Sequence, residues 1–219
     1  MAVIHNTTLT PTKLELLTAW LPDQPWYQAV DAAPELSRAG GFRLDDPAGQ
    51  VGIEFMLVVD VATGAAVSYL VPLSYRSERL HPDGVGLIGT TQHGVLGQRW
   101  VHDGAHDPVV AAQLLALLQR QAEPQSQSIS NTTEPTVIAE FFAPPPIVAH
   151  RFSVSEGRQG TEIRAEALDG TAVSMRLERR PRPGSDVDAE ADALGRLTGG
   201  WTLPDASAVR GLLATSHAG

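Results

Sequence analysis

The apolar positions form two stretches with helical spacing and several runs that are typical of strands. Residues 11–21 are predicted to form the first helix, and Pro22 ends it. Its apolar face consists of Leu14, Leu17 and Leu21, with Trp20 beside it. Two starts fit this segment, because Thr10 can cap a helix that opens at Pro11, while Thr12 and Glu15 have the spacing of a capping box.

A second helix is predicted over residues 108–121. Asp107 is its expected N-cap and Pro108 its first residue, where no backbone amide hydrogen is needed. Four leucines give it a broad apolar face: Leu114, Leu115, Leu117 and Leu118. This helix should therefore pack firmly on a sheet.

Most other apolar runs predict strands. In the first half they cover residues 41–44, 51–60, 66–75, 85–88 and 98–101, and in the second half 136–142, 147–155, 161–168 and 171–179. Short turns join several of them, of which Asp169-Gly170 is the strongest hairpin signal, so the pairing should be antiparallel. Two short helices are expected near residues 187–196 and 204–214.

These elements predict an α+β fold, in which an antiparallel sheet carries helices packed on one face and a second β-rich block follows. Residues 122–135 are polar and contain two prolines, which is typical of a linker or an irregular edge segment. We therefore expect an α+β unit over residues 1–122, and a β-rich block with C-terminal helices over residues 136–219.

Composition excludes several classes of partner and of chemistry. The 219 residues carry a formal net charge of −9, so nucleic acid and anionic membranes are not expected partners. There is no cysteine, which excludes disulfides, thiolate catalysis and iron–sulfur clusters. We find neither a signal-peptide pattern nor a membrane-spanning run, and so expect a cytoplasmic protein.

The segment from His102 to Asp107 (HDGAHD) is the richest polar cluster. Its histidines and aspartates, in particular His102, Asp103 and His106, could bind a metal or act as acids and bases. Alternatively, Asp107 is a helix cap and the histidines are loop residues. The second interpretation is favoured, because an aspartate directly before a helix start already has a capping role and HDGAHD matches no zinc signature. We assign no metal, cofactor or catalytic residue.

Two further patterns have alternative interpretations. His93 lies in the glycine-rich segment 86–97, which lacks the spacing of a phosphate-binding loop and is more typical of turns in a meander. The indoles of Trp20, Trp26 and Trp100 could form a sugar-stacking platform, although tryptophans more often belong to the core.

Several segments resemble the N-terminal cap of maltokinases. The segment from Thr10 to Tyr27 resembles the cap's opening, in which a helix ends in Leu-Pro (Leu21-Pro22) before an aromatic pair (Trp26-Tyr27). Later segments also resemble the family. Residues 51–58 and 68–73 resemble the cap's strand pair, residues 101–108 resemble the entry to its last helix, and residues 125–132 resemble the start of the kinase lobe. The resemblance covers about residues 8–132 and extends to stand-alone actinobacterial cap-like proteins, some labelled 1,4-alpha-glucan branching proteins.

The resemblance implies a pathway. Maltokinases phosphorylate maltose with ATP for α-glucan synthesis, and their cap is a cystatin-like arrangement of sheet and helix without catalytic residues. Kinase activity is not expected here, because Lys13 is the only lysine and lies on the first predicted helix, whereas such kinases need a strand lysine at the ATP phosphates. A branching enzyme is not expected either, since its (β/α)8 barrel needs about 250 residues.

The leading hypothesis is a non-catalytic accessory or interaction module in maltose, trehalose or glycogen metabolism, whose partner is an α-glucan enzyme or a sugar. The alternatives are a small carbohydrate-active enzyme and a sugar- or nucleotide-binding sensor that uses the region of His102 and His106. The candidate ligand or interaction residues are Trp20, Trp26, Tyr27, His93, Trp100, His102, Asp103 and His106.

Overall fold

The computed structural model describes residues 9–28, 31–62, 64–129, 131–142, 145–185 and 192–219. The first half contains β1 (Leu9–Thr10), α1 (Lys13–Trp20), β2 (Leu36–Leu44), β3 (Gly52–Asp60), β4 (Val67–Arg76), β5 (Leu87–His93), β6 (Gly97–Asp103) and α2 (Pro108–Leu118). The second half contains β7 (Ile138–Phe141), β8 (Ala149–Gly157), β9 (Gly160–Ala167), β10 (Ala172–Leu177), β11 (Gly195–Thr202) and β12 (Ala208–Ala218). Two short 3-10 helices follow α1 and β6, at Leu21–Asp23 and Gly104–His106.

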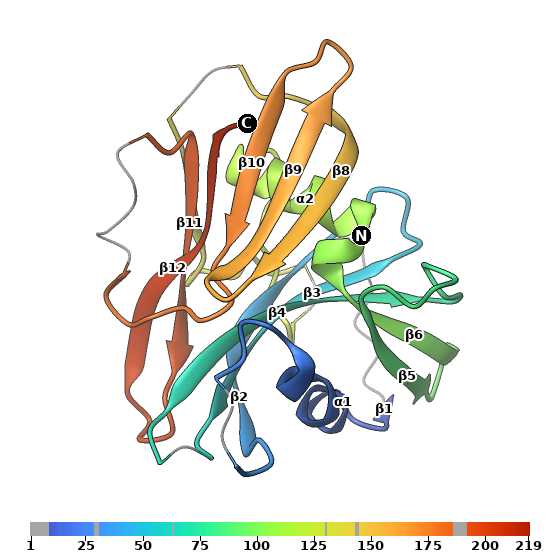
Figure 1. Cartoon of the computed structure of the whole chain (residues 1–219), viewed down its shortest axis with the longest axis vertical. Coiled ribbons are helices and arrows are strands. Elements are labelled where there is room, and N and C mark those ends of the chain that lie inside the picture. The colour runs from blue at the N-terminus through green and yellow to red at the C-terminus, as the bar shows by residue number, and fades with distance from the viewer. Residues whose placement is uncertain (1–8, 29–30, 63, 130, 143–144, 186–191) are drawn as a thin grey trace.

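The described strands form one antiparallel sheet in the order β1-β5-β6-β4-β3-β2-β11-β12-β10-β9-β8, with β7 on the side of β11 (Figure 1). The sheet is strongly paired within each half, and nine residue pairs join β3 to β4. The two halves meet differently, because β2 and β11 are joined through the single pair Gly40 and Trp201. The Trp201 indole N–H adds a bond across this junction by donating to Ser68 Oγ at 2.9 Å.

The two helices lie on opposite faces of the first half of the sheet. Alternate residues of β3 point to opposite sides. Ile53 and Phe55 belong to the core that contains α2, whereas Met56 and Val58 belong to a second core with Leu17 of α1. The antiparallel sheet is thus confirmed, but the expectation that both helices pack on one face is wrong. The chain is predominantly β, with two short α-helices in its described part.

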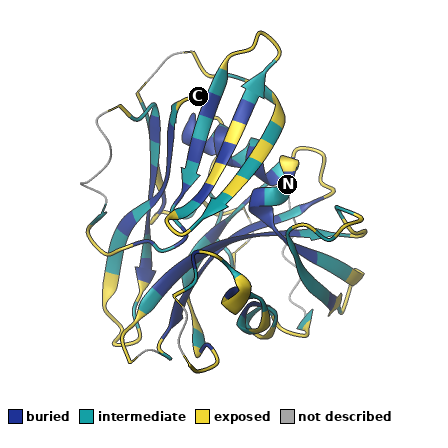
Figure 2. Ribbon diagram, in the orientation of Figure 1, coloured by how far each residue is buried: buried dark blue, intermediate teal, exposed yellow. Residues whose placement is uncertain are grey.

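The core around α2 includes both halves of the chain. Leu114, Leu115, Leu117 and Leu118 are buried in it together with residues of β9, β10, β11 and β12. In Figure 1, α2 lies behind β8, β9 and β10, and Figure 2 shows that most of it is buried. The division into units at 1–122 and 136–219 remains a prediction about which parts fold alone. The shared core is relevant to this prediction, because residues of both ranges are packed together in it.

Local signals explain both helix starts. Thr12, rather than Thr10, caps α1, and Thr12 and Glu15 form the capping box. Asp107 caps α2 as predicted, since its Oδ1 accepts from the amide of Val109 at 3.0 Å. The hairpin at Asp169-Gly170 is also confirmed, because β9 and β10 pair across it.

The two expected C-terminal helices are not formed in the described residues. Residues 208–214 of the second one, which was expected over 204–214, lie in β12, and this strand pairs with β10 and β11. The first expected helix, 187–196, begins outside the described residues, and its last two residues belong to β11. A short apolar run fits a helix or a strand, and here the two neighbouring strands determine the outcome. No helix in the described part of the chain has both the length and the apolar character of a membrane span.

Candidate functional site

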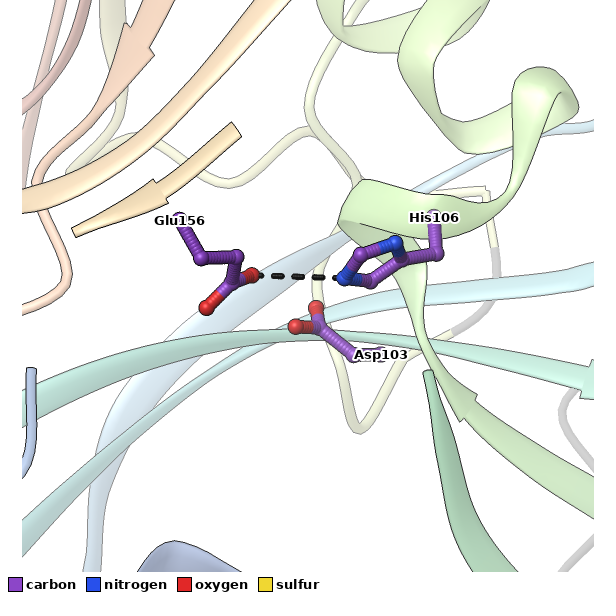
Figure 3. Close-up of side chains that lie close together, drawn as sticks. All are labelled: Asp103, His106 and Glu156. Carbon is purple, nitrogen blue, oxygen red and sulfur yellow. Dashed lines mark ion pairs between the residues drawn. The ribbon is translucent and has the colours of Figure 1, made fainter. Parts of the chain in front are cut away.

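Two of the sequence candidates, Asp103 and His106, meet a residue from the other half of the chain. Asp103 ends β6 and caps the 3-10 helix Gly104–His106, because its Oδ1 accepts from the backbone amide of Ala105. Glu156 comes from the end of β8, and its Oε1 lies 3.3 Å from His106 Nε2 (Figure 3). The three side chains converge at the place where the β-rich block meets the first half.

Arg179 joins the two carboxylates. Its Nη2 donates to Asp103 Oδ2 at 2.5 Å and to Glu156 Oε1 at 3.2 Å, and its Nε donates to Thr161 Oγ1 at 2.6 Å. The guanidinium lies over the indole of Trp26 at 4.7 Å, and Trp26 Nε1 donates to Glu156 Oε2 at 2.9 Å. We call Trp26, Asp103, His106, Glu156, Thr161 and Arg179 the Arg179 cluster.

The cluster is largely dry. The side chains of Arg179 and Asp103 are 0% and 1% exposed, whereas those of His106 and Glu156 are each 19% exposed. Bonds in such a place are stronger than in water, and an unpaired charge would be costly. Among the described residues, His106 and Glu156 therefore form the side of the cluster that faces solvent.

The pKa shifts follow from these contacts. Burial alone would raise the pKa of Glu156, but the hydrogen bond from His106, the charge of Arg179 and the bond from Trp26 outweigh it and lower the pKa to about 2. The bond to Glu156 in turn raises the pKa of His106, against the opposing effect of burial. At neutral pH, Glu156 is therefore an ionised acceptor for both His106 and Arg179.

The same atoms raise the question of a metal. Asp103, His106 and Glu156 each offer a ligand atom within 4.8 Å of the others, and two carboxylates with an imidazole are a reasonable donor set for a divalent cation. However, the Arg179 guanidinium bonds to both carboxylates, so a cation would have to displace a buried positive charge. The arrangement fits an ion-pair cluster better than a metal centre.

His102 and Asp107 have contacts that indicate a structural role. His102 is fully buried and its Nε2 accepts from the amide of Leu80 at 3.2 Å, and burial lowers its pKa to about 4. Besides capping α2, Asp107 pairs with Arg76 through both carboxylate oxygens, at 2.6 and 2.7 Å. This supports the capping interpretation of Asp107 and places a neutral imidazole at His102.

The remaining candidates do not form one site. Trp20 packs edge-on to Trp26 at 5.8 Å, and Tyr27 donates its hydroxyl hydrogen to Asp60 Oδ2 at 2.9 Å. Trp100 lies instead beside the guanidinium of Arg79, and His93 Nδ1 accepts from the turn amides of Val95 and Leu96. Trp26 is buried in the second core, so these indoles do not present a common stacking surface.

Sequence reasoning missed half of the Arg179 cluster: Glu156, Thr161 and Arg179. Arg179 lies just after a strand, in the pair Arg179-Arg180, and nothing local distinguishes the buried arginine from an exposed one. Its partners lie 18 to 76 residues away along the chain. Only the alternation of β10, which turns Met175 and Leu177 inward, hinted that Arg179 would follow them into the core.

Comparison with known proteins identifies one part of the chain. The family model of the maltokinase N-terminal cap domain matches residues 20–107, and a search of curated proteins finds no match. The matched segment supplies Trp26, Asp103 and His106 to the Arg179 cluster, whereas Glu156, Thr161 and Arg179 come from the block that follows it. The resemblance inferred from the sequence is therefore confirmed: residues 20–107 match the maltokinase N-terminal cap domain family.

Proposed function

We propose that this protein is a non-catalytic, cap-like accessory module of maltose, trehalose or glycogen metabolism, which works in the cytoplasm by contacting an α-glucan enzyme or a sugar. The cap-domain match associates the chain with maltose and α-glucan metabolism. The accessory role is the finer part of the proposal and rests on the bonding of the polar residues.

The observation that carries it is that the groups best suited to chemistry are already bonded to each other. A general acid or base needs a pKa near the working pH and reach to a substrate. Glu156, with its pKa near 2, stays ionised and accepts from His106, Trp26 and Arg179. Asp103 pairs with Arg179, and buried His102 stays neutral. The cluster is therefore suited to holding two parts of a protein together.

The lone lysine has a similar role. Lys13 Nζ lies 2.6 Å from Glu54 Oε2 and 5.7 Å from the ring centre of Tyr75, on the α1 side of the sheet. Glu54 also accepts hydrogen bonds from the Tyr75 hydroxyl and from the side-chain amide of Gln127. This places Lys13 in a structural network, which supports the proposal that the protein does not use a lysine to bind ATP phosphates.

A sugar is one of the two proposed contacts, and a polar hollow favours it. A hollow of about 520 Å³ lies where β2 meets β11 and is lined by Arg38, Gln127, Glu134 and Arg210 together with glycine backbone. Hydrogen-bonding side chains around an open hollow suit hydroxyl groups. Titration calorimetry with maltose and maltotriose tests this contact, and Arg210→Met should weaken any heat signal that arises in the hollow.

The experiment has a catalytic and a binding arm. The purified chain is incubated with magnesium-ATP and maltose, and with amylose, while ATP consumption, sugar phosphate and branching are followed; we expect no turnover. In the second arm, glycogen affinity electrophoresis and size-exclusion chromatography with purified maltokinase, maltosyltransferase and branching enzyme should show retardation or a complex.

Two results would overturn the proposal. The first is turnover that disappears in Glu156→Gln or Asp103→Asn while the melting temperature shows that the variant is folded. The second is the absence of binding in every pairing, which would leave the accessory role without a partner. Arg164→Met, an exposed change on β9, is the matched control for both arms.

A further inference from the structure

An apolar cavity lies at the C-terminal end of α2, away from the Arg179 cluster. Its volume is about 630 Å³, and its walls come from α2, the loop before β8, and the ends of β9, β10 and β12. Its lining includes Leu115, Gln119, Ile147, Leu168, Val173 and Ser216. This volume is within the range of small-molecule sites, which are usually concave and mainly apolar with few polar groups.

One wall of the cavity is fixed by a pair of hydrogen bonds. Gln119, the residue after α2, accepts from the amide of Ile147 at 2.6 Å and donates to its carbonyl at 3.0 Å. Gln119 is buried, so these bonds are sheltered from water. The loop therefore stays on α2, and the cavity is formed before any ligand arrives.

The mouth of the cavity is unusually apolar. Leu168 and Val148 both line it, with exposed fractions of 87% and 83%, the two highest among the exposed large apolar residues of the described chain. Leu168 lies in the turn between β9 and β10, and Val148 directly precedes β8. Exposed apolar groups around a hollow mark binding sites more often than isolated ones do.

One residue of the cavity lining, Ser216, carries a buried hydroxyl. Ser216 is 1% exposed, and its Oγ has no hydrogen-bond partner among the described residues. Ser216 shares one face of β12 with Ala214, which packs in the core with α2, and with Ala218, which lines the cavity. Buried polar atoms are normally paired, so this hydroxyl is available to a water molecule or to an acceptor atom of a ligand, and the ligand must displace the water.

The charges of the lining exclude one class of ligand. Asp169 is the charged residue of the lining as the structure describes it, and its Oδ1 accepts from the amide of Thr171. A carboxylate or phosphate would meet no positive partner there and would be repelled by Asp169. An anion is therefore excluded, and a cation would have to leave water for mainly apolar walls, so the occupant should be uncharged.

We propose that this cavity binds a small, uncharged, mainly hydrocarbon molecule with one hydrogen-bond acceptor, such as a medium-chain ketone or ester. The hydrocarbon part lies against Leu115, Val173 and the rim residues, and its acceptor oxygen accepts a hydrogen bond from the Ser216 hydroxyl. This site is separate from the proposed accessory function and does not depend on it.

The test uses the full chain and the fluorescent probe N-phenyl-1-naphthylamine, which is apolar and uncharged. Probe fluorescence should rise to saturation at one site, and both 2-decanone and decane should displace the probe. Ser216→Ala should weaken 2-decanone about 3- to 10-fold, the effect of one neutral hydrogen bond, and leave decane unchanged. Leu168→Arg should weaken both ligands, whereas Val95→Arg, an equivalent change at another exposed site, should weaken neither.

Three outcomes would overturn the proposal, provided that melting curves show each variant to be folded. They are no saturable probe binding, binding that neither cavity variant changes, and an equal loss of both ligands in Ser216→Ala. Sedimentation velocity distinguishes the protein-docking alternative: a dimer that Leu168→Arg dissociates, without probe binding in the wild-type chain, would assign the patch to a second copy of the chain.

Discussion

Replacing Arg179 by methionine should cost this protein a large part of its stability. Methionine keeps the unbranched carbon stem but removes the guanidinium, which leaves Asp103 and Glu156 without their shared partner. Removing one member of a buried ion pair costs about 3–5 kcal/mol, because the other charge stays buried and unpaired. Since Asp103 is 1% exposed and Glu156 keeps its contacts to His106 and Trp26, most of this cost should arise at Asp103.

Urea unfolding measures the effect. With a slope of about 2 kcal/mol per molar, the loss corresponds to a midpoint lowered by about 1.5–2.5 M, out of a total stability of about 5–15 kcal/mol. The exposed control Arg164→Met should stay within about 0.5 kcal/mol of the wild type.

A double-mutant cycle separates the ion pair from a general loss of packing. Asp103→Asn removes the charge that Arg179 neutralises, so adding it to Arg179→Met should cost far less than the sum of the two single changes. If the two costs are additive, or if Arg179→Met costs less than about 1 kcal/mol, then the cluster does not hold the halves together and the reasoning fails.

Acid should destabilise the protein in two windows. The pKa of His102 is about 4 in the folded chain and 6.5 when unfolded, so stability is lost as the pH falls from about 6.5 to 4. The pKa of Glu156 is about 2 in the folded chain and 4.5 when unfolded, so further stability is lost as the pH falls from about 4.5 to 2. Urea titrations at each pH should show both, His102→Gln should remove the first, and a flat profile above pH 4.5 would contradict the argument. Asp107→Ala should lower the free energy of unfolding by about 3–5 kcal/mol, more than the loss of a helix cap alone, because it also leaves Arg76 unpaired. A loss of less than about 1 kcal/mol, measured by thermal melting, would show that the ion pair contributes little. A fragment of residues 1–122 should bind a hydrophobic dye and lack cooperative melting, because the α2 core needs strands from the second half; a sharp transition would instead establish an autonomous unit.

Local signals made part of this fold predictable. The Asp-Pro start of α2 and the capping box of α1 depend on residues at most three positions apart, so both are predictable from the local sequence. The Asp169-Gly170 hairpin is equally local. The second role of Asp107, its ion pair with Arg76, is not predictable from local sequence, because Arg76 lies 31 residues earlier, at the end of β4.

Long-range contacts determine what the sequence could not show. Residues 208–218 contain an apolar run that fits a helix, and only their pairing with β10 and β11 makes them a strand. In the same way, the residue types of Asp103 and His106 predict a polar site, but their role depends on Glu156 and Arg179, which come from the second half of the chain. The candidate site was therefore located by sequence and explained only by the tertiary structure.

The position of α2 has an evolutionary consequence. Its leucines face strands from the second half of the chain, so this helix is not a free surface of the cap. A gene rearrangement that moved the cap and α2 onto another protein would expose these leucines, unless the new neighbour supplied an apolar surface of similar shape. Relatives that keep the four leucines should therefore also keep β9, β10 and β12, and relatives that have lost these strands should carry polar residues at the leucine positions.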